Sequence, residues 1–236
     1  MRLALGDQHS IILKQDGSVW TAGFNKNGQL GDGSTAHHAK FVSVFINGAK
    51  AVAAASDCSM ILSKDGSVWA TGLNEYGQLG DGSTNSRSTY LKVMPSGVEA
   101  VSAGREHSMV LKQDGSVWAT GRNNHGQLGD GTTTSRIGFV QVIPSGVKAV
   151  ATGDYYSMVL KDDGSLWATG SNSNGQLGAG SNIDEYVVFS KVVESSVQRV
   201  AAGGQHCLML KHDSSVWTSG HNLFGRLGDG GIYSCR

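Results

Sequence analysis

Three groups of residues in this sequence have types and spacings that could carry out chemistry. Asp7, His9 and Ser10 are the residue types of a hydrolase triad. The segment GQLGDGST from Gly77 to Thr84 superficially resembles a glycine-rich phosphate-binding loop. Zinc-ligand types recur at one position of the sequence pattern, as His9, Cys58, His107 and His206.

None of these groups meets the geometric needs of its chemistry. Asp7, His9 and Ser10 are neighbours in a predicted turn, whereas the members of a triad converge in space beside an oxyanion hole. The glycine-rich segment lacks the lysine of a phosphate-binding loop, precedes a strand and recurs along the chain. The zinc-type residues are expected on separate sheets about 10 Å apart, while zinc needs donors about 2.0–2.3 Å from one point. We predict no enzyme, no metal site and no cofactor, and interpret these residues as turn-stabilising or solvated polar groups.

The elements that carry these residues form a repeat. The five tryptophans, Trp20, Trp69, Trp118, Trp167 and Trp217, are spaced by 49, 49, 49 and 50 residues, a period typical of repeat architectures. The 34 glycines and 2 prolines indicate many tight turns in an ordered fold. We predict one domain over residues 1–236, with repeats at about 1–48, 49–97, 98–146, 147–196 and 197–236.

Each repeat is predicted to contain four short strands, which in the third copy span residues 99–104, 108–113, 116–121 and 139–144. Asp114-Gly115 separates the second strand from the third, and such a pair predicts a type I′ hairpin with positive φ at both central residues. The fifth copy has Asp213-Ser214 there, so we expect a non-glycine residue at positive φ.

Five four-stranded sheets with one tryptophan each predict an all-β protein, a β-propeller whose tryptophans are buried between blades. The last copy ends at GDGGIYSCR without a convincing fourth strand, so the last blade is expected to be incomplete. Ring closure stays open among three alternatives: a closed five-bladed ring, an open arc of a longer protein, and an edge paired with another copy. We favour an incomplete propeller.

Composition limits the partners. With 19 Lys+Arg against 19 Asp+Glu there is no net charge and no strong nucleic-acid signal. No apolar run is long enough for a signal peptide or a membrane span, so we expect a soluble protein. The 3 cysteines lack framework spacing, which favours reduced thiols and a cytoplasmic or nuclear setting, with a bacterial origin equally compatible.

The repeated motifs resemble those of the regulator of chromosome condensation family. These motifs are G-x-x-H-S at Gly6–Ser10 and Gly104–Ser108, followed by K-x-D-G-S-V-W and G-x-N-x-x-G-Q-L-G-D-G. The resemblance implies a propeller, usually of seven blades, that serves most members as a protein-binding platform and the founding member as a nucleotide-exchange factor for a small GTPase. No copy has a tryptophan in the turn between its first and second strands, so the tryptophan clusters of the ultraviolet-photoreceptor branch of this family are missing. The uniform inter-repeat segments leave no room for the wedge with which the exchange factor engages its GTPase.

If the recurring residues are scaffold, function is expected where the copies differ. They differ in the turn between the first and second strands and in the loop between the third and fourth strands, which leave an antiparallel sheet at the same end. We call this end the variable face. Its candidate partner-binding residues are Tyr76, Arg105, Glu106, Arg122, His125, Tyr155, Tyr156 and Phe224.

The favoured function is therefore a non-enzymatic scaffold that binds a protein partner through the variable face. The alternative is a guanine-nucleotide exchange factor, or regulator, for a small GTPase acting through the same face.

Overall fold

A computed structural model describes residues 1–45 and 47–235, and this part of the chain contains nineteen β-strands and no helix. The strands form five antiparallel sheets, four with four strands and the last with three. Within each sheet, the strands that pair follow one another in the sequence. The predicted all-β fold of five repeated sheets is confirmed, including the incomplete last sheet.

Each sheet is one blade, with strands of four to six residues and, in the first four blades, a longer fourth strand of eight or nine residues. The first blade contains β1 (Arg2–Leu5), β2 (His9–Leu13), β3 (Val19–Gly23) and β4 (His38–Phe45). The second contains β5 (Ala49–Ala54), β6 (Cys58–Ser63), β7 (Val68–Gly72) and β8 (Arg87–Met94). The third contains β9 (Val98–Ala103), β10 (His107–Lys112), β11 (Val117–Gly121) and β12 (Arg136–Ile143). The fourth contains β13 (Val147–Thr152), β14 (Tyr156–Lys161), β15 (Leu166–Ser171) and β16 (Glu185–Val193). The fifth contains β17 (Val197–Ala202), β18 (His206–Lys211) and β19 (Val216–Gly220).

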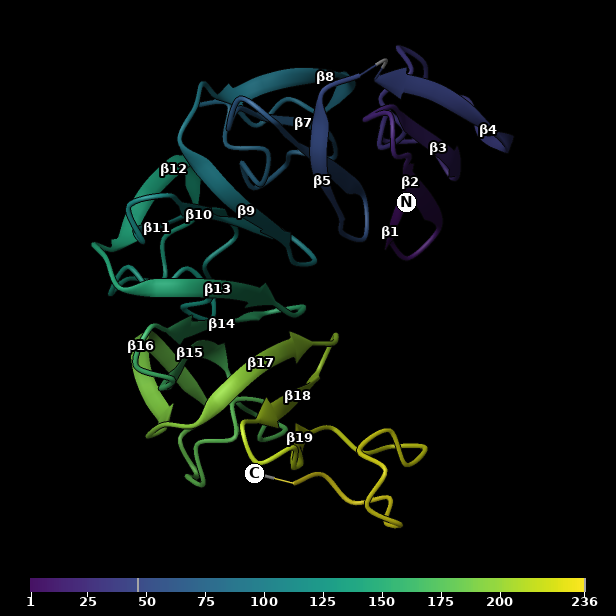
Figure 1. Cartoon of the computed structure of the whole chain (residues 1–236). Coiled ribbons are helices and arrows are strands. Elements are labelled where there is room, and N and C mark those ends of the chain that lie inside the picture. The colour runs from purple at the N-terminus through teal and green to yellow at the C-terminus, as the bar shows by residue number, and fades with distance from the viewer. Residues whose placement is uncertain (46, 236) are drawn as a thin grey trace.

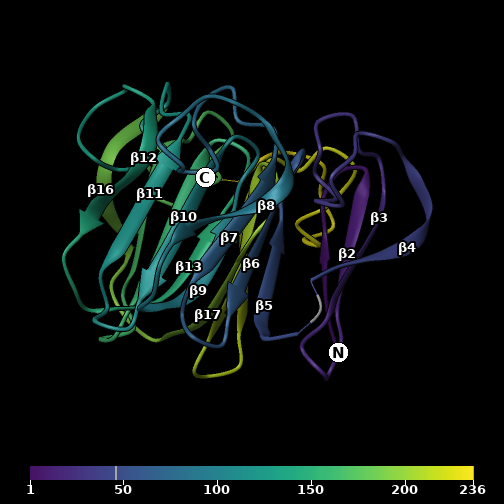
Figure 2. The ribbon, with the colours of Figure 1, turned by 90° about the horizontal axis from the view of Figure 1, so that it is seen from above.

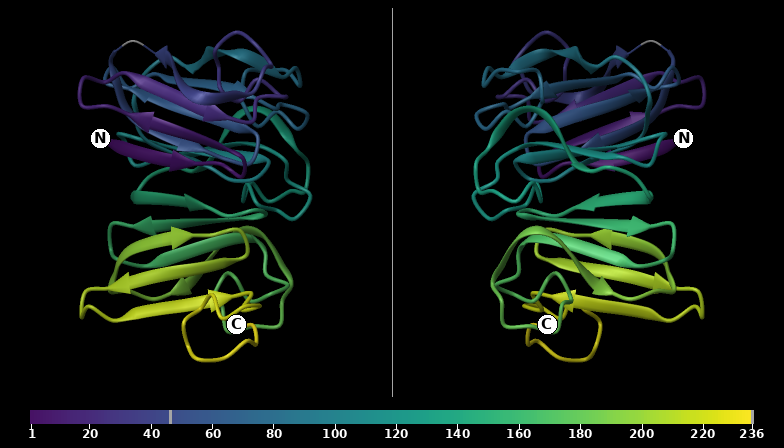
Figure 3. Two further views of the ribbon diagram at one scale, coloured as in Figure 1. Left: turned by 90° about the vertical axis from the view of Figure 1, so that its right-hand side faces the viewer. Right: turned by 90° about the vertical axis from the view of Figure 1, so that its left-hand side faces the viewer.

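The blades form an arc that is open between the first blade and the last (Figure 1). The first strands β5, β9, β13 and β17 lie towards the inside of the arc, and the fourth strands lie towards its outside. From above, the first blade stands at one end of the row of strands (Figure 2). From the side, the blades are layered in chain order from the N-terminus to the C-terminus (Figure 3).

The hairpin between the second and third strands differs from the predicted type I′ turn. Only the glycine has positive φ, for example 84° at Gly17 and 77° at Gly115. The Gly17 N–H donates to Lys14 O at 3.1 Å, and the Lys14 N–H donates to Ser18 O at 2.9 Å, so the loop is one residue longer than predicted. The Asp16 carboxylate accepts hydrogen bonds from Ser18 N and Ser18 Oγ, which holds the aspartate out of the left-handed region. The prediction for the fifth copy is confirmed, because Ser214 has φ 68°.

The hydrophobic core lies between the blades. Ile11, Leu13 and Val19 of the first blade pack against Ile61 and Trp69 of the second. The same positions of the second blade pack against Val110 and Trp118 of the third. Each blade therefore has a forward face, from alternate residues of its second and third strands, and a backward face that contains its tryptophan.

Trp69, Trp118 and Trp167 lie between blades as predicted, but they are half-buried instead of fully buried. Trp20, on the first blade, is also half-buried, and Trp217 of the last blade is exposed. The Trp118 Nε1–H donates to Ser116 Oγ at 3.1 Å, and Lys112 Nζ lies 4.3 Å from the ring centroid. The lysine covers part of the ring while its ammonium group stays near water.

A buried histidine connects some of the blades. His107 Nε2 lies 2.8 Å from Ser157 Oγ of the next blade, and this hydroxyl donates to Gln127 O at 2.7 Å. Because the serine proton is used for the carbonyl, His107 Nε2 carries a proton and donates it to the serine. His107 Nδ1 is then an acceptor, and it has no partner among the described residues. Burial lowers the pKa of His107 to about 4.

The two ends of the arc expose apolar side chains that are covered elsewhere. Leu3 and Leu5 of the first blade are exposed, whereas the equivalent Val52 and Ala54 pack against the blade before them. Val216 of the last blade is 63% exposed and Trp217 is 55% exposed, while Val68 and Val117 are fully buried. The end blades thus lack neighbours that the internal blades have.

We predict that Trp118→Ala lowers the free energy of unfolding by about 2–4 kcal/mol, because the ring packs between two complete blades. Trp217→Ala should cost less than about 1.5 kcal/mol, because more than half of that side chain already contacts water. Denaturant titration of both variants measures the difference. Equal losses would mean that the last blade packs as tightly as the third in solution.

We also predict that the free energy of unfolding decreases as the pH is lowered, because of His107. Its pKa is about 4 in the folded state against an ordinary value of 6.5, so the unfolded chain takes up the proton first. This contribution to stability is fully present above about pH 6.5 and is lost as the pH falls towards 4, with an upper limit on the order of 3 kcal/mol. Denaturant titrations at several pH values should give a flatter profile for His107→Gln than for the wild type. The exposed His212 provides the control, since His212→Gln should keep the wild-type slope.

Candidate functional site

The variable face is built from two loops in every blade, and the structure joins them directly. The Arg122 N–H, at the start of the third–fourth loop, donates to Glu106 O in the first–second turn at 2.8 Å. The equivalent bonds run from Phe24 to Gln8, from Leu73 to Asp57, from Ser171 to Tyr155 and from His221 to Gln205. The expectation that both connections leave the sheet at one end is therefore confirmed.

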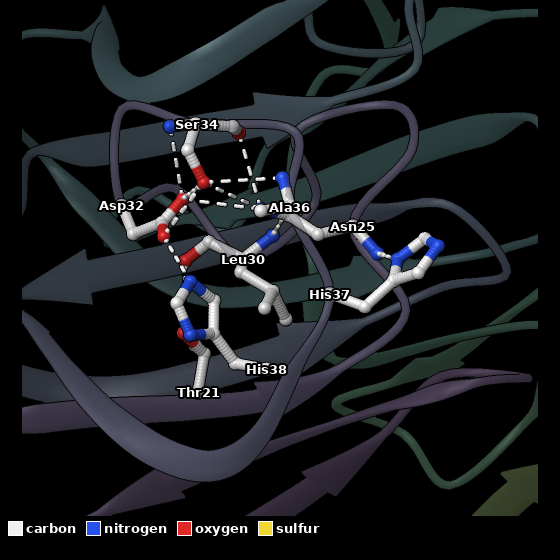
Figure 4. A network of polar contacts seen from close by, with 8 residues as sticks. All are labelled: Thr21, Asn25, Leu30, Asp32, Ser34, Ala36, His37 and His38. Atoms are coloured by element: carbon white, nitrogen blue, oxygen red, sulfur yellow. Dashed lines mark hydrogen bonds and ion pairs between the residues drawn. The ribbon is translucent and has the colours of Figure 1, made fainter.

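The recurring glycine-rich loop is held by its own side chains. In the first blade, Asn25 Oδ1 accepts from Leu30 N at 2.9 Å, and Asn25 Nδ2 donates to Asp32 Oδ1 at 3.1 Å. The Asp32 carboxylate also accepts from Ser34 N and contacts His38 (Figure 4). The second and third blades repeat this arrangement around Asp81 and Asp130, with an arginine in place of the histidine. These polar groups stabilise the loop itself.

The same hydrogen bonds determine the ionisation of these carboxyl groups. Burial acts to raise the pKa of Asp81, but hydrogen bonds from Arg87, Ser83 and Asn74 outweigh it and lower the pKa below the usual range. The carboxylate is therefore charged at neutral pH and is occupied by donors of its own loop, which leaves it few free lone pairs.

The candidate residues of the second, third and fourth blades come together on this face. The Arg122 guanidinium carbon lies 4.8 Å from the ring centroid of Tyr76 and 5.7 Å from that of Tyr155. Arg122 Nη1 donates to Glu106 Oε2 at 2.6 Å, and this hydrogen bond raises the pKa of Arg122. Both rings are within the range of cation–π attraction. Arg122 of the third blade thus contacts one tyrosine of the second blade and one of the fourth.

Two further candidates complete the group. The Arg105 guanidinium carbon lies 5.9 Å from the Tyr155 centroid, and the His125 ring centroid lies 5.3 Å from it. His125 Nδ1 also contacts the exposed carboxylate of Glu185 at 2.5 Å. We call the following set the cationic–aromatic cluster: Tyr76, Arg105, Glu106, Arg122, His125 and Tyr155.

Arg105 of the cluster also lines a small pocket of about 140 Å³. The first–second turns of all five blades line it, with Asp7, Arg105 and Asp154 as the charged residues. Burial raises the pKa of Asp154; Arg105 acts in the opposite direction, and Asp7 and Glu106 add to the rise. Arg105 therefore lies between the carboxyl groups of this pocket, Asp7 and Asp154, and the Tyr155 ring.

Two candidates lie outside the cluster. Tyr156 is fully buried, and its one hydroxyl proton lies between two backbone carbonyls of the next blade, His206 O at 2.5 Å and Gly203 O at 3.0 Å. It was predicted at the surface because it follows Tyr155 in a turn, but it begins β14 and points into the core, so it is a correction to the candidate set. Phe224 is 86% exposed, at φ 71°, on the fifth blade. No ring or ion-pair contact joins Phe224 to the cluster in the described part of the chain.

Sequence reasoning missed two residues beside the cluster. Glu185 contacts His125 across 60 positions of sequence, which no local pattern could indicate. Gln127 is buried, and its Nε2 has no partner among the described residues. In the first blade the equivalent Gln29 Nε2 donates to Asp57 of the second blade at 2.9 Å. The position equivalent to Asp57 in the fourth blade is Tyr155, which gives Gln127 no carboxylate to donate to. Comparing the repeats could have found this change.

One of the residues first considered for catalysis, His9, contacts the next blade. His9 Nε2 lies 2.9 Å from Ser59 Oγ of the next blade, so it serves an interblade contact like that of His107. Within residues 1–45 and 47–235 no group of three or more His, Cys, Asp or Glu side chains could hold a metal ion. The same residues contain no helix of the length and apolarity that crossing a membrane requires.

Comparison with known sequence families gives one matching repeat. The regulator of chromosome condensation (RCC1) repeat matches residues 16–62, 65–111, 114–160 and 163–210. A second sequence model of the same repeat matches residues 2–29, 49–78, 98–127 and 147–176. No curated protein matches the chain significantly.

Solved structures with the same fold are larger. Human WBSCR16 superimposes with a TM-score of 0.90 at 24% identity, over 100% of this chain and 65% of its own. Yeast RCC1 (Prp20), in its complex with Kap60, superimposes with a TM-score of 0.81 at 22% identity, over 94% of this chain and 56% of its own. Prp20p of Saccharomyces cerevisiae, described with its binding properties to Gsp1p and histones, gives a TM-score of 0.76 at 22% identity, over 90% and 57%. This chain therefore spans less than two thirds of the length of these proteins.

The two adjacent tyrosines should respond differently to loss of the hydroxyl group. Tyr156→Phe removes the hydroxyl group that donates to the backbone carbonyls of the next blade and should lower the free energy of unfolding by about 1–2 kcal/mol. Tyr155→Phe, at a half-buried surface ring, should change it by less than about 0.5 kcal/mol. Urea titration of the two variants measures both. A neutral Tyr156→Phe would contradict its assignment to the core.

Proposed function

The chain belongs to the regulator of chromosome condensation repeat family, and on that premise we propose that it is a non-enzymatic scaffold that binds a protein partner through its cationic–aromatic cluster. The observation that supports this most is the position of Arg122 between Tyr76 and Tyr155. These side chains come from three blades, and the repeated core does not need them. The equivalents of Arg122 in the other blades are Phe24, Leu73, Ser171 and His221.

The chemistry of the cluster suits a protein surface. Tyrosine and arginine are enriched among the residues that dominate binding energy at interfaces, because they offer large contact areas and directed polar groups. Arg122 is preorganised by Glu106, so little side-chain entropy is lost when a partner covers it. Arg105 is exposed and makes no ion pair within the described residues. We infer a partner surface with a carboxylate for Arg105 and an apolar or aromatic group for the tyrosines.

The scaffold proposal agrees with the way the other polar groups are used. The serine and aspartate side chains of the glycine-rich loops are hydrogen-bonded within their own loops, and the buried histidines face the next blade. A catalytic role would require such groups to be free for a substrate. The structure offers a surface with defined shape and charge, which is the requirement for recognition.

The second candidate is nucleotide exchange on a small GTPase. Its support is the likeness to Prp20p, a protein with binding properties to Gsp1p. The third–fourth loops of the first four blades span residues 24–37, 73–86, 122–135 and 172–184, so within the described residues none of them is longer than the others in the way that the family resemblance associates with exchange. This candidate would use the same face.

We predict that partner capture depends on the cluster. A tagged wild-type chain should retain a protein from a lysate of the source organism, and Arg122→Ala with Tyr155→Ala should reduce the retained amount at least tenfold. Gln113→Ala with Lys148→Ala provides a matched control, because it also removes one positive charge but lies among the opposite turns. Circular dichroism melting checks that both double variants fold. Loss of the partner in the control and retention in the cluster variant would place binding on the opposite face.

We further predict that the captured partner is bound without catalysis of nucleotide release. If it is a small GTPase, release of a labelled guanine nucleotide from it should proceed at the same rate with and without the chain. An acceleration that is lost in the Arg122→Ala, Tyr155→Ala variant would support the exchange candidate and contradict a pure scaffold.

A further inference from the structure

A buried hydrogen-bond donor without an acceptor borders the cationic–aromatic cluster. The side chain of Gln127 is fully buried, and its Nε2 has no partner among the described residues. Its Oε1 accepts from His125 N at 2.9 Å, which fixes the orientation of the amide. A buried donor without an acceptor destabilises the folded state, so an acceptor that another molecule brings to this amide is bound favourably.

The first repeat shows which acceptor an amide at this position takes. Gln29 is the equivalent of Gln127, and its Oε1 likewise accepts a loop N–H, that of Asn27, at 3.1 Å. Its Nε2 donates to the Asp57 carboxylate in the first–second turn of the next blade at 2.9 Å. The amide of Gln127 is held in the same way, but the residue at that turn position is Tyr155. The chain itself thus supplies a carboxylate to the first amide and none to the second.

Gln127 and Tyr155 approach the same point of the fourth blade. A Cβ atom on Gly170 would lie 2.4 Å from Tyr155 O and 3.2 Å from Gln127 Cα. The Tyr155 ring is half-buried, and its neighbours in the cluster are the exposed or half-buried side chains of Arg105, Arg122 and His125. Such a ring can turn about χ1 from one staggered position to another.

We propose that Gln127 determines the specificity of this face by donating a hydrogen bond to a carboxylate of the protein partner, the side chain of an Asp or Glu. The carboxylate takes the place that Asp57 has beside Gln29, and the Tyr155 ring turns aside to admit it. This inference rests on the proposed function, because it concerns the same surface.

The charges around Tyr155 favour an acidic group. The guanidinium carbons of Arg105 and Arg122 lie 5.9 and 5.7 Å from the centre of its ring. Arg105 makes no ion pair among the described residues, and the one carboxylate that Arg122 contacts is Glu106. A carboxylate beside Tyr155 therefore meets two positive side chains as well as the amide of Gln127. Its hydrogen bond with that amide is stronger than the bond of a neutral acceptor, because the acceptor is charged.

Two capped tripeptides test the proposal on the wild-type protein. Acetyl-Gly-Asp-Gly-amide carries a carboxylate, and acetyl-Gly-Asn-Gly-amide is a neutral match of nearly the same shape. Each peptide is titrated into the full isotope-labelled chain, and the side-chain amide signals of Gln127 are followed by NMR. These signals are assigned by their loss in Gln127→Glu. We expect the aspartate peptide to shift them and to bind about tenfold more tightly than the asparagine peptide.

A matched pair of variants separates the donor from the added charge. Gln127→Glu keeps an oxygen for His125 N and replaces the donor by a second oxygen. Gln176→Glu makes the same change in the next blade, where Oε1 accepts from Asn174 N and Nε2 contacts Ser171 Oγ, a hydroxyl that can donate instead. We expect Gln127→Glu to bind the aspartate peptide at least about tenfold more weakly than the wild type, and Gln176→Glu to stay within about twofold of it.

Four results would overturn the proposal. These are equal affinities of the two peptides, Gln127 signals that do not move, an unchanged affinity in Gln127→Glu, and the absence of binding by either peptide. Equal affinities with shifted Gln127 signals would assign the amide to a neutral acceptor, such as a backbone carbonyl of the partner. Circular dichroism melting checks that both variants fold, and the comparison of the two peptides on the wild type needs neither variant.

Partner capture with the same variants keeps this inference apart from the function on which it rests. If Arg122→Ala with Tyr155→Ala loses the partner while Gln127→Glu retains it, only the role of Gln127 is wrong. If all of these variants retain the partner, the cluster is not the binding surface and the proposed function fails.

Discussion

The packing of each blade's backward face on the forward face of the blade before it is the contact on which this fold depends. A four-stranded sheet cannot bury both faces alone, and here residues such as Ile61, Val110 and Trp118 supply the cover for their neighbours. The histidine–serine contacts lie between the same faces, and burial there lowers the pKa of His107. The aromatic rings of the fourth strands also contact glycines of the preceding blade. Where a neighbour is missing, at Leu3 or Val216, apolar surface is exposed.

Much of this architecture could be predicted because the same sequence pattern recurs in every repeat. The tryptophan period and the recurring turns indicated five sheets, and the short last copy indicated a missing strand. Local geometry was harder to predict. The Asp16-Gly17 pair suggested a two-residue turn, but the Asp16 carboxylate caps a longer one. Tryptophan was expected to be buried, yet the ring of Trp118 is only half-buried and is covered in part by a lysine.

The candidate site was predicted in part for the same reason. Variation between repeats identified the loops that carry Arg122 and Tyr155, and the blade order brought them together. The sequence could not separate Tyr155 from Tyr156, because one residue decides whether a side chain at the start of a strand faces solvent or core. Glu185 was missed because its contact with His125 depends on how two loops of different blades approach each other.

The central claim is that a repeated scaffold presents one variable face for recognition. Amide hydrogen exchange of the chain, with and without the partner that it captures, tests this most directly. The account predicts new protection in the first–second turns of the third and fourth blades and in the third–fourth loops that carry Tyr76 and Arg122. Protection confined to the hairpins at Gly17, Gly66, Gly115 and Gly164 would contradict it.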